Sequence, residues 1–272
     1  MSKYYSAWKK AIHATSFDWG ANLTVGERKK IYESFNEIRL LNEYADRISA
    51  GSFYEIGCAT GELYRYLAPK HPKFRYSGFD ISGPAIERAK EKFPHVEFTL
   101  VGEDLGEVAT VAPTVLFARD VVLHQLDPFA FLRQLLSIPQ EAIILRIRTR
   151  DKGATVLDPE VSCQWHYGEW VPYMVLNLDE VIAAVREVRP FAEMHIVKNV
   201  LQLGGHHNRF LPKECYMPET GTAETALYIR FSGDSDVDAE PQVKIEERAD
   251  SVQEWSLGER VWRKIRNRLL AR

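Results

Sequence analysis

Two glycines that follow a short apolar run form the segment of this chain with the clearest chemistry. Residues 53–63 read FYEIGCATGEL, so an apolar run carries an acid, Glu55, and then turns through Gly57 and Gly61. Glycine lets the backbone adopt turn geometry and approach a ligand closely. We expect a strand that leads directly into a helix over 62–67, whose N-terminus points toward the same place. The segment therefore predicts a ligand-binding turn at the end of a strand.

The spacing of the two glycines favours some ligands over others. A dinucleotide site uses three glycines in the pattern G-x-G-x-x-G, whereas only two glycines occur here, with three other residues between them. This spacing disfavours a pyrophosphate and, with it, a nicotinamide-dependent oxidoreductase. A second strand, expected at 75–80, ends in Asp80. A carboxylate in that position suits a ribose, because it can accept hydrogen bonds from two neighbouring hydroxyls.

Two further strand ends carry charged side chains. These strands are expected at 96–101 and 115–120, and ligands of open α/β sheets bind beyond the carboxyl ends of the strands. The charged residues in or just after these strand ends are Glu103, Asp104, Arg119 and Asp120.

The pattern acid-x-Gly-x-x-x-Gly at the end of a first strand resembles motif I of the class I S-adenosylmethionine-dependent methyltransferases. The resemblance covers about residues 50–150 and extends more loosely to 232. It implies S-adenosylmethionine as the cofactor, an acid at the end of the second strand for the ribose, and Glu103 or Asp104 near the adenine. The residues that it implies for cofactor binding are Glu55, Gly57, Cys58, Ala59, Gly61, Asp80, Ile81, Glu103, Asp104 and Arg119.

Strand and helix signals alternate from 52 to 148, which is typical of a parallel sheet covered on both faces. Further strands near 193–201 and 226–231 would complete it. We expect an α/β fold with a Rossmann-like, mostly parallel, seven-stranded sheet and helices on both faces. The resemblance implies that the last strand runs antiparallel beside the fifth and the sixth.

Three parts follow from this pattern. An aromatic-rich N-terminal helical cap is expected at 1–50, where most aromatic residues would serve packing, and a methyltransferase domain at 51–232. The tail at 233–272 begins with an acidic stretch to 250 that is expected to be a solvated linker. It ends with a basic amphipathic helix at 255–272. Such a helix can dock on its own domain, bind a protein partner or lie on an anionic membrane surface.

Composition narrows the setting in which the protein works. The chain has 272 residues and a net charge of -3, which gives no general attraction to nucleic acid. No segment approaches the roughly 18 consecutive apolar residues of a membrane span, and the polar, lysine-bearing start is not a signal peptide. We expect a cytoplasmic protein, with peripheral contact at the inner face of a membrane as an option for the tail. Three cysteines without metal-ligand spacing fit a reducing compartment and no bound metal.

Methyl transfer requires an acceptor held in line with the methyl group and, for a hydroxyl or ammonium, removal of a proton. Histidine is the natural base at neutral pH. His124, just past the fourth strand, is the best-placed candidate, followed by His166 and His207. Asp120 and Arg119 border the same loop and could orient an acceptor, or Arg119 could instead pair with an acid at the strand end. No motif of the Asn-Pro-Pro-Tyr type follows the fourth strand, which argues against nucleic acid amino groups as acceptors.

The acceptor side is expected in what is added to the sheet. An irregular segment at 149–177 carries Trp165, His166, Tyr167, Trp170 and Tyr173, and forms either a pocket wall or lid or an aromatic plug over the sheet. A second wall is expected at 204–210, where the adjacent histidines would point in different directions, so a metal pair is disfavoured.

These observations predict a methyltransferase that acts on a small-molecule or carbohydrate acceptor, at a hydroxyl. The alternative from another class is a non-catalytic S-adenosylmethionine-binding or scaffold module tethered by its basic tail. Within the fold, an aminopropyl transferase lacks support, because no acid-lined polyamine pocket is evident.

Overall fold

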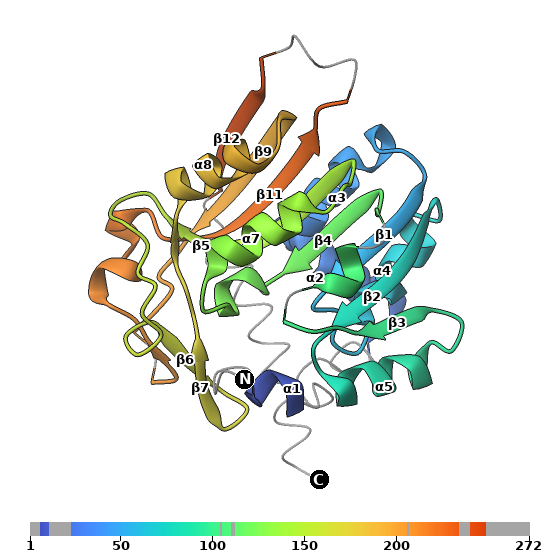
Figure 1. Ribbon diagram of the computed structural model, residues 1–272, viewed down its shortest axis with the longest axis horizontal. Coiled ribbons are helices and arrows are strands. Elements are labelled where there is room, and N and C mark those ends of the chain that lie inside the picture. Colours follow the sequence, from blue (N-terminus) through green and yellow to red (C-terminus); the bar gives the residue numbers. More distant parts are fainter. Residues whose placement is uncertain are drawn as a thin grey trace.

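A large, mostly parallel sheet with helices on both faces dominates the computed structural model (Figure 1). The structure describes residues 6–10, 23–103, 105–109, 112–205, 207–233 and 240–248. The predicted α/β, Rossmann-like fold is confirmed.

The first half of the sheet consists of five parallel strands in the order β3-β2-β1-β4-β5. They are β1 (Gly51–Ile56), β2 (Phe74–Asp80), β3 (Glu97–Leu100), β4 (Val115–Arg119) and β5 (Ala142–Arg150). Their central residues are nearly all apolar and buried, as expected for strands covered on both faces. All five therefore bring their carboxyl ends to one edge of the sheet.

Two long strands extend the sheet beyond β5. β11 (Ala223–Phe231) lies antiparallel between β5 and β9 (Phe191–Val200), as the resemblance implied. These seven strands are the predicted ones. A two-residue strand, β8 (Leu176–Asn177), adds a short parallel pairing at the end of β5.

An additional edge strand corrects the prediction for the tail. Residues 242–248, expected within a solvated linker, form β12 (Gln242–Arg248), which pairs in parallel with β9. Lys198 of β9 is almost completely buried, and its ammonium lies 2.8 Å from Glu247 and 2.7 Å from Asp151. Glu247, whose charge in the sequence indicates a solvated linker, thus neutralises the buried ammonium of Lys198. The basic segment 255–272 lies outside the described residues.

Two helical layers cover the sheet. α7 (Pro128–Ser137) and α8 (Leu178–Val188) pack on one face, together with Val108 of the short α6 (Gly106–Ala109). The other face is covered by α3 (Asn36–Tyr44), α4 (Glu62–Lys70) and α5 (Gly83–Lys92). Side chains of Ser82, Asp127 and Asn177 cap the N-termini of α5, α7 and α8. No described helix is long and apolar enough to cross a membrane.

The N-terminal part is helical where it is described. α1 (Ser6–Lys10) is short, and after residue 24 the helical part consists of α2 (Val25–Ser34) and α3, with a break between them. A capping box of Thr24 and Glu27 begins α2, and the extended backbone of Phe35 ends it. The ring of Phe35 then lies against the guanidinium groups of Arg119 and Arg146. The break thus brings the cap into contact with the carboxyl ends of β4 and β5.

A small second sheet replaces much of the irregular segment expected at 149–177. β6 (Cys163–His166) and β7 (Glu169–Pro172) form a hairpin, and β10 (Arg209–Phe210) pairs with β6. Tyr167 and Gly168 connect the hairpin, and both have positive φ, of 50° and 82°. This is the geometry of the tight turns that match the twist of paired strands. Figure 1 shows the hairpin and α1 at the same edge of the molecule. The described residues also form the short 3-10 helices η4 (Ala45–Arg47), η5 (Val122–His124), η6 (Lys213–Cys215) and η7 (Pro218–Thr220).

Candidate active site

A cavity of about 330 Å³ lies at the carboxyl ends of the central strands. The turn after β1 lines one side of it, and the β6–β7 hairpin and β10 contribute to the other. Eleven of the predicted site residues line this cavity: Glu55, Gly57, Cys58, Ala59, Asp80, Ile81, Glu103, Arg119, Asp120, His124 and His166. Gly61 belongs to the same turn without lining the cavity, His207 is exposed on the surface, and Asp104 lies outside the described residues.

The turn after β1 needs glycine at 57 and 61 for two reasons: the backbone conformation and the lack of room for a side chain. Gly57 and Gly61 have φ of 76° and 75°, in the left-handed region that side chains disfavour. A Cβ atom at Gly57 would lie 2.4 Å from Cγ2 of Val121, and one at Gly61 would lie 2.6 Å from Cζ of Phe98. The turn is therefore a tightly packed backbone cradle.

Asp80 holds this turn in place through hydrogen bonds and keeps further acceptor sites available for a ligand. One carboxylate oxygen accepts a hydrogen bond from the backbone N–H of Ala59 at 2.8 Å, and the other accepts one from Ser82 at 2.8 Å. An ionised carboxylate can accept about four hydrogen bonds. Asp80 lines the cavity, so its remaining acceptor sites fit the two hydroxyls of a ribose.

Glu55 is a buried carboxyl in the cavity wall. Burial raises its pKa to about 7, although a hydrogen bond from the Tyr76 hydroxyl and the charge of Arg119 oppose the rise. The carboxyl is thus close to half-ionised at neutral pH. A cationic amine bound beside it would favour the ionised form.

The structure pairs Arg119 with an acid of the helical cap. Its guanidinium lies 3.7 Å from the carboxylate of Glu37, which is 1% exposed. The sequence left open whether Arg119 orients a ligand or pairs with an acid. Arg119 pairs with Glu37 while still lining the cavity.

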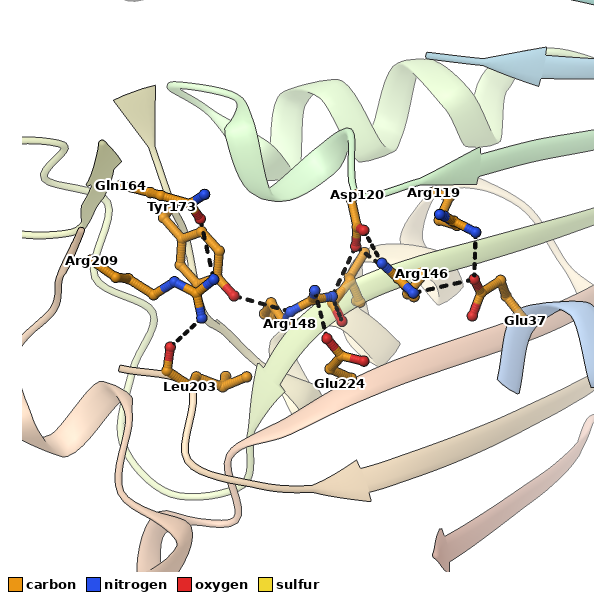
Figure 2. A network of polar contacts seen from close by, with 11 residues as sticks. Glu37, Arg119, Asp120, Arg146, Arg148, Gln164, Tyr173, Leu203, Arg209 and Glu224 are labelled. Carbon is orange, nitrogen blue, oxygen red and sulfur yellow. Dashed lines mark hydrogen bonds and ion pairs between the residues drawn. The ribbon is translucent and has the colours of Figure 1, made fainter. Parts of the chain in front are cut away.

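Asp120 is the centre of a buried ion network (Figure 2). It accepts hydrogen bonds from Nε of Arg146 at 2.9 Å and from Nη1 of Arg148 at 2.8 Å. Burial alone would raise the pKa of Asp120, but Arg146 and Arg148 outweigh burial and hold it well below its usual range. Asp120 therefore stays ionised and positions arginines. It does not suit proton transfer.

His124, at the end of η5, is held in one orientation by the hairpin. Its Nδ1 lies 2.7 Å from the carbonyl oxygen of Pro172. Because a carbonyl only accepts, Nδ1 carries the proton and Nε2 keeps its lone pair. Burial lowers the pKa of His124 to about 4, despite the opposing effect of the Pro172 carbonyl. The ring is therefore neutral at physiological pH, with a fixed tautomer.

Helix α1 contacts both sides of the cavity, which the sequence did not predict. The Trp8 ring lies 4.6 Å from the ring of His124 and 5.3 Å from that of His166, measured between centroids. Ser6 bonds to Glu169 of the hairpin, and Lys9 lies 2.7 Å from Glu103 after β3. Trp8 was expected only to pack, and it lines the cavity instead.

The hairpin is a pocket wall, but its tryptophans are on its outer face. Gln164 and His166 line the cavity, whereas the intervening Trp165 pairs with Trp170 across the hairpin. Alternate residues of a strand face opposite sides, and the two tryptophans are 45% and 43% exposed. The predicted wall is supported, although its aromatic residues contribute through Tyr173 and not through the tryptophans.

Several lining residues were not singled out in the sequence analysis, although Gln164 and Arg209 lie within the two walls predicted there. Arg148, Gln164 and Arg209 line the cavity beside Tyr173. The sequence did contain a signal for Arg148, because Arg146, Arg148 and Arg150 alternate with mainly apolar residues in β5. We call Glu55, Gly57, Cys58, Ala59, Asp80 and Ile81 the turn side of the cavity. We call His124, Arg148, Gln164, His166, Tyr173 and Arg209 its hairpin side.

Comparisons with known proteins agree with this geometry. Residues 54–138 match the family described as "Methyltransferase domain". The N-terminal domain of EvdMO1 with SAH bound is similar in structure, at 14% identity over 75% of this chain and 84% of that chain, with a TM-score of 0.51. An O-methyltransferase from a trans-AT PKS multienzyme of Brevibacillus brevis, in complex with S-adenosyl-L-homocysteine, shares 12% identity over 82% of this chain and 80% of that chain, with a TM-score of 0.50.

At these identities the structural likeness shows the fold, and the methyltransferase domain match covers residues 54–138. The glycine turn, Asp80 and the order of the strands are the features expected of that family. The chain therefore carries a match to the methyltransferase domain family over residues 54–138, and S-adenosylmethionine is the cofactor that this match indicates.

Proposed function

We propose that this protein transfers a methyl group to a hydroxyl of a small-molecule or carbohydrate acceptor. The observation that carries the proposal is His124, a neutral histidine in the cavity wall whose Nδ1 proton is held by the carbonyl of Pro172. An acceptor hydroxyl must lose its proton during transfer, and a positioned histidine is suited to take it.

The turn side would hold the cofactor. When bound, S-adenosylmethionine supplies an activated methyl group on a sulfonium. Asp80 would accept hydrogen bonds from the ribose, and Glu55 would accept them from the amino group, which favours the ionised carboxylate. The glycine turn lets the backbone approach closely enough for both contacts.

The hairpin side would hold the acceptor. Nε2 of His124 would take the proton from the hydroxyl as the carbon–oxygen bond forms. Because burial lowers the pKa of His124 to about 4, the imidazolium would give the proton up again readily at neutral pH. Trp8 covers this part of the cavity and would help to exclude water.

The test is methyl transfer from S-adenosylmethionine to a panel of sugars and small hydroxylated compounds, followed by formation of S-adenosylhomocysteine. We expect His124→Gln to lower kcat by about 100-fold or more while S-adenosylhomocysteine still binds. His95→Gln, which changes an exposed histidine far from the cavity, is the control. Equal kcat in wild type and His124→Gln would remove the assigned base. Cofactor binding without turnover on any acceptor would favour the scaffold module.

The tail bears on where the reaction takes place. The predicted contact of 255–272 with a membrane surface would suit a lipid-linked carbohydrate acceptor. Membrane fractionation of the chain with and without this segment tests the idea, and unchanged fractionation would argue against it.

A further inference from the structure

Four arginines lie along the hairpin side and its border with the cap, and three of them are paired with acids (Figure 2). Arg119 pairs with Glu37, Arg146 with Glu37 and Asp120, and Arg148 with Asp120 and Glu224. The fourth, Arg209, begins β10 and lines the cavity.

Arg209 contacts only neutral groups. Nη1 donates to the carbonyl oxygen of Leu203 at 2.5 Å, and Nη2 donates to the side-chain oxygen of Gln164 at 3.3 Å. The guanidinium carbon lies 4.1 Å from the centre of the Tyr173 ring. Within the described part of the chain, no carboxylate lies in ion-pair distance of this side chain.

This arrangement leaves a positive charge without a carboxylate in direct contact, in a partly buried place where the more distant carboxylates of Glu224 and Asp120 act on it. Removing a charge from water is costly unless an opposite charge or hydrogen bonds compensate for it. Burial accordingly lowers the pKa of Arg209 from its ordinary value. Its hydrogen bonds to Leu203 and Gln164 use one N–H of each terminal nitrogen, so one N–H remains on each. A guanidinium with N–H groups to spare can donate to the oxygens of a carboxylate or a phosphate.

The position of Arg209 places its positive charge on the hairpin side of the cavity, where the acceptor is proposed to bind. The arginine near Glu55, which lines the turn side, is Arg119, whose charge lowers the pKa of Glu55. Arg209 instead belongs to the small sheet beyond β5, where it shares Tyr173 with Arg148, since Nε of Arg148 lies 3.1 Å from the Tyr173 hydroxyl. Figure 2 shows Arg209 and Arg119 at opposite ends of the network.

We propose that Arg209 recognises an anionic group, a carboxylate or a phosphate, on the acceptor. This inference rests on the proposed function, because it takes the hairpin side as the acceptor site. It narrows the acceptor from any hydroxyl compound to a hydroxyl compound that also carries an anion.

The test uses small probes and needs no turnover. Benzoate, phenyl phosphate and neutral benzamide are titrated into protein saturated with S-adenosylhomocysteine, and ligand-observed NMR gives each Kd. We expect one or both anions to bind at least about tenfold more tightly than benzamide. The preferred anion identifies the group as a carboxylate or a phosphate.

Two variants locate the binding. Arg209→Gln should weaken anion binding about tenfold or more, whereas Arg186→Gln, on the exposed face of α8, should not change it. Because Arg209→Gln also loses the bond to Leu203, Gln164→Glu provides a second variant. It places a carboxylate beside the guanidinium, so the fold is kept while the probe is displaced.

The outcomes separate this inference from the proposed function. Failure of both anions to bind better than benzamide, or equal anion binding to wild type and both variants, would overturn the role of Arg209. Absence of methyl transfer with anion binding intact would instead count against the proposed reaction alone.

Discussion

The two sides of the cavity are built in different ways. The turn side comes from a continuous backbone segment plus one neighbouring strand end, and its shape is set by glycine conformations and backbone hydrogen bonds to Asp80. The hairpin side is assembled from η5, β5, β6 and β10, which are far apart in the sequence, and long polar side chains hold it together. Local backbone geometry thus forms the side proposed to bind the cofactor, whereas side chains from distant segments form the side proposed to bind the acceptor.

The largest effect is expected from breaking the ion network on the hairpin side. Asp120→Asn would leave two buried arginines, Arg146 and Arg148, without their central carboxylate. Loss of one partner of a buried ion pair costs about 3–5 kcal/mol, which a denaturant titration would measure. Asp179→Asn, at an exposed position of α8, is the control. A loss below about 1 kcal/mol would mean that the network behaves like surface pairs.

The next effect concerns the turn side alone. Gly57→Val would place a side chain at positive φ and only 2.4 Å from Val121. Backbone strain and overpacking together cost on the order of 4 kcal/mol, so we expect S-adenosylhomocysteine binding to be lost in calorimetry. Gly26→Ala, where nothing lies within 4 Å of the new Cβ, should bind normally. Normal binding by Gly57→Val would show that the turn tolerates side chains after all.

A pH-dependent effect would sharpen the contrast further. Burial raises the folded-state pKa of Glu55 to about 7 from 4.5, so the folded protein binds more protons than the unfolded chain between these values. Glu55 therefore adds to the free energy of unfolding when it is protonated, below pH 4.5. This contribution is lost as the pH rises to 7. Glu55→Gln should gain on the order of 3 kcal/mol over wild type at pH 8 and little at pH 4.5.

Thermal unfolding of both proteins between pH 4.5 and 8 measures this difference. Glu87→Gln, which replaces an exposed carboxylate of α5, serves as the comparison variant. A stability difference that stays constant with pH would contradict the shifted titration of Glu55.

The smallest effect should distinguish the cavity-facing side of the hairpin, which Trp8 of α1 covers, from its outer face. Trp8→Ala removes a ring that covers His124 and His166, and we expect kcat/KM to fall about tenfold, or 1.4 kcal/mol. Trp170→Ala removes an exposed ring from the outer face and should leave kcat/KM unchanged. Steady-state kinetics decide, and equal effects of the two substitutions would place the outer face in the acceptor site.

The sequence predicted the turn side well because its information is local. An acid, two glycines and a second strand end lie within 26 residues, from Glu55 to Asp80, and each has a recognisable conformation. The hairpin side was predicted only in part. His124 and His166 line the cavity, and Arg209 lies in the second wall expected at 204–210, whereas Trp8 and Arg148 were not assigned to the site, because only the tertiary fold brings their segments together.

Charge was the least reliable guide. Acids of the tail suggested solvation, yet Glu247 neutralises the buried Lys198 and β12 joins the sheet. Asp120 suggested chemistry, yet it anchors two arginines. In both places the oppositely charged partner lies on a strand far away in the sequence. The charge of a residue alone therefore does not show whether its side chain is solvated or paired.

Strand β12 also determines how the molecule presents itself to other copies. It is the outermost strand at its end of the sheet within the described chain, and it covers the backbone edge of β9. An open strand edge is a template for intermolecular pairing, and charged side chains are a common defence against it. Four of the seven residues of β12 are charged, Lys244, Glu246, Glu247 and Arg248. The sheet therefore ends in a strand that discourages aggregation, so removal of β12 would expose the longer and more buried β9 to edge-to-edge association.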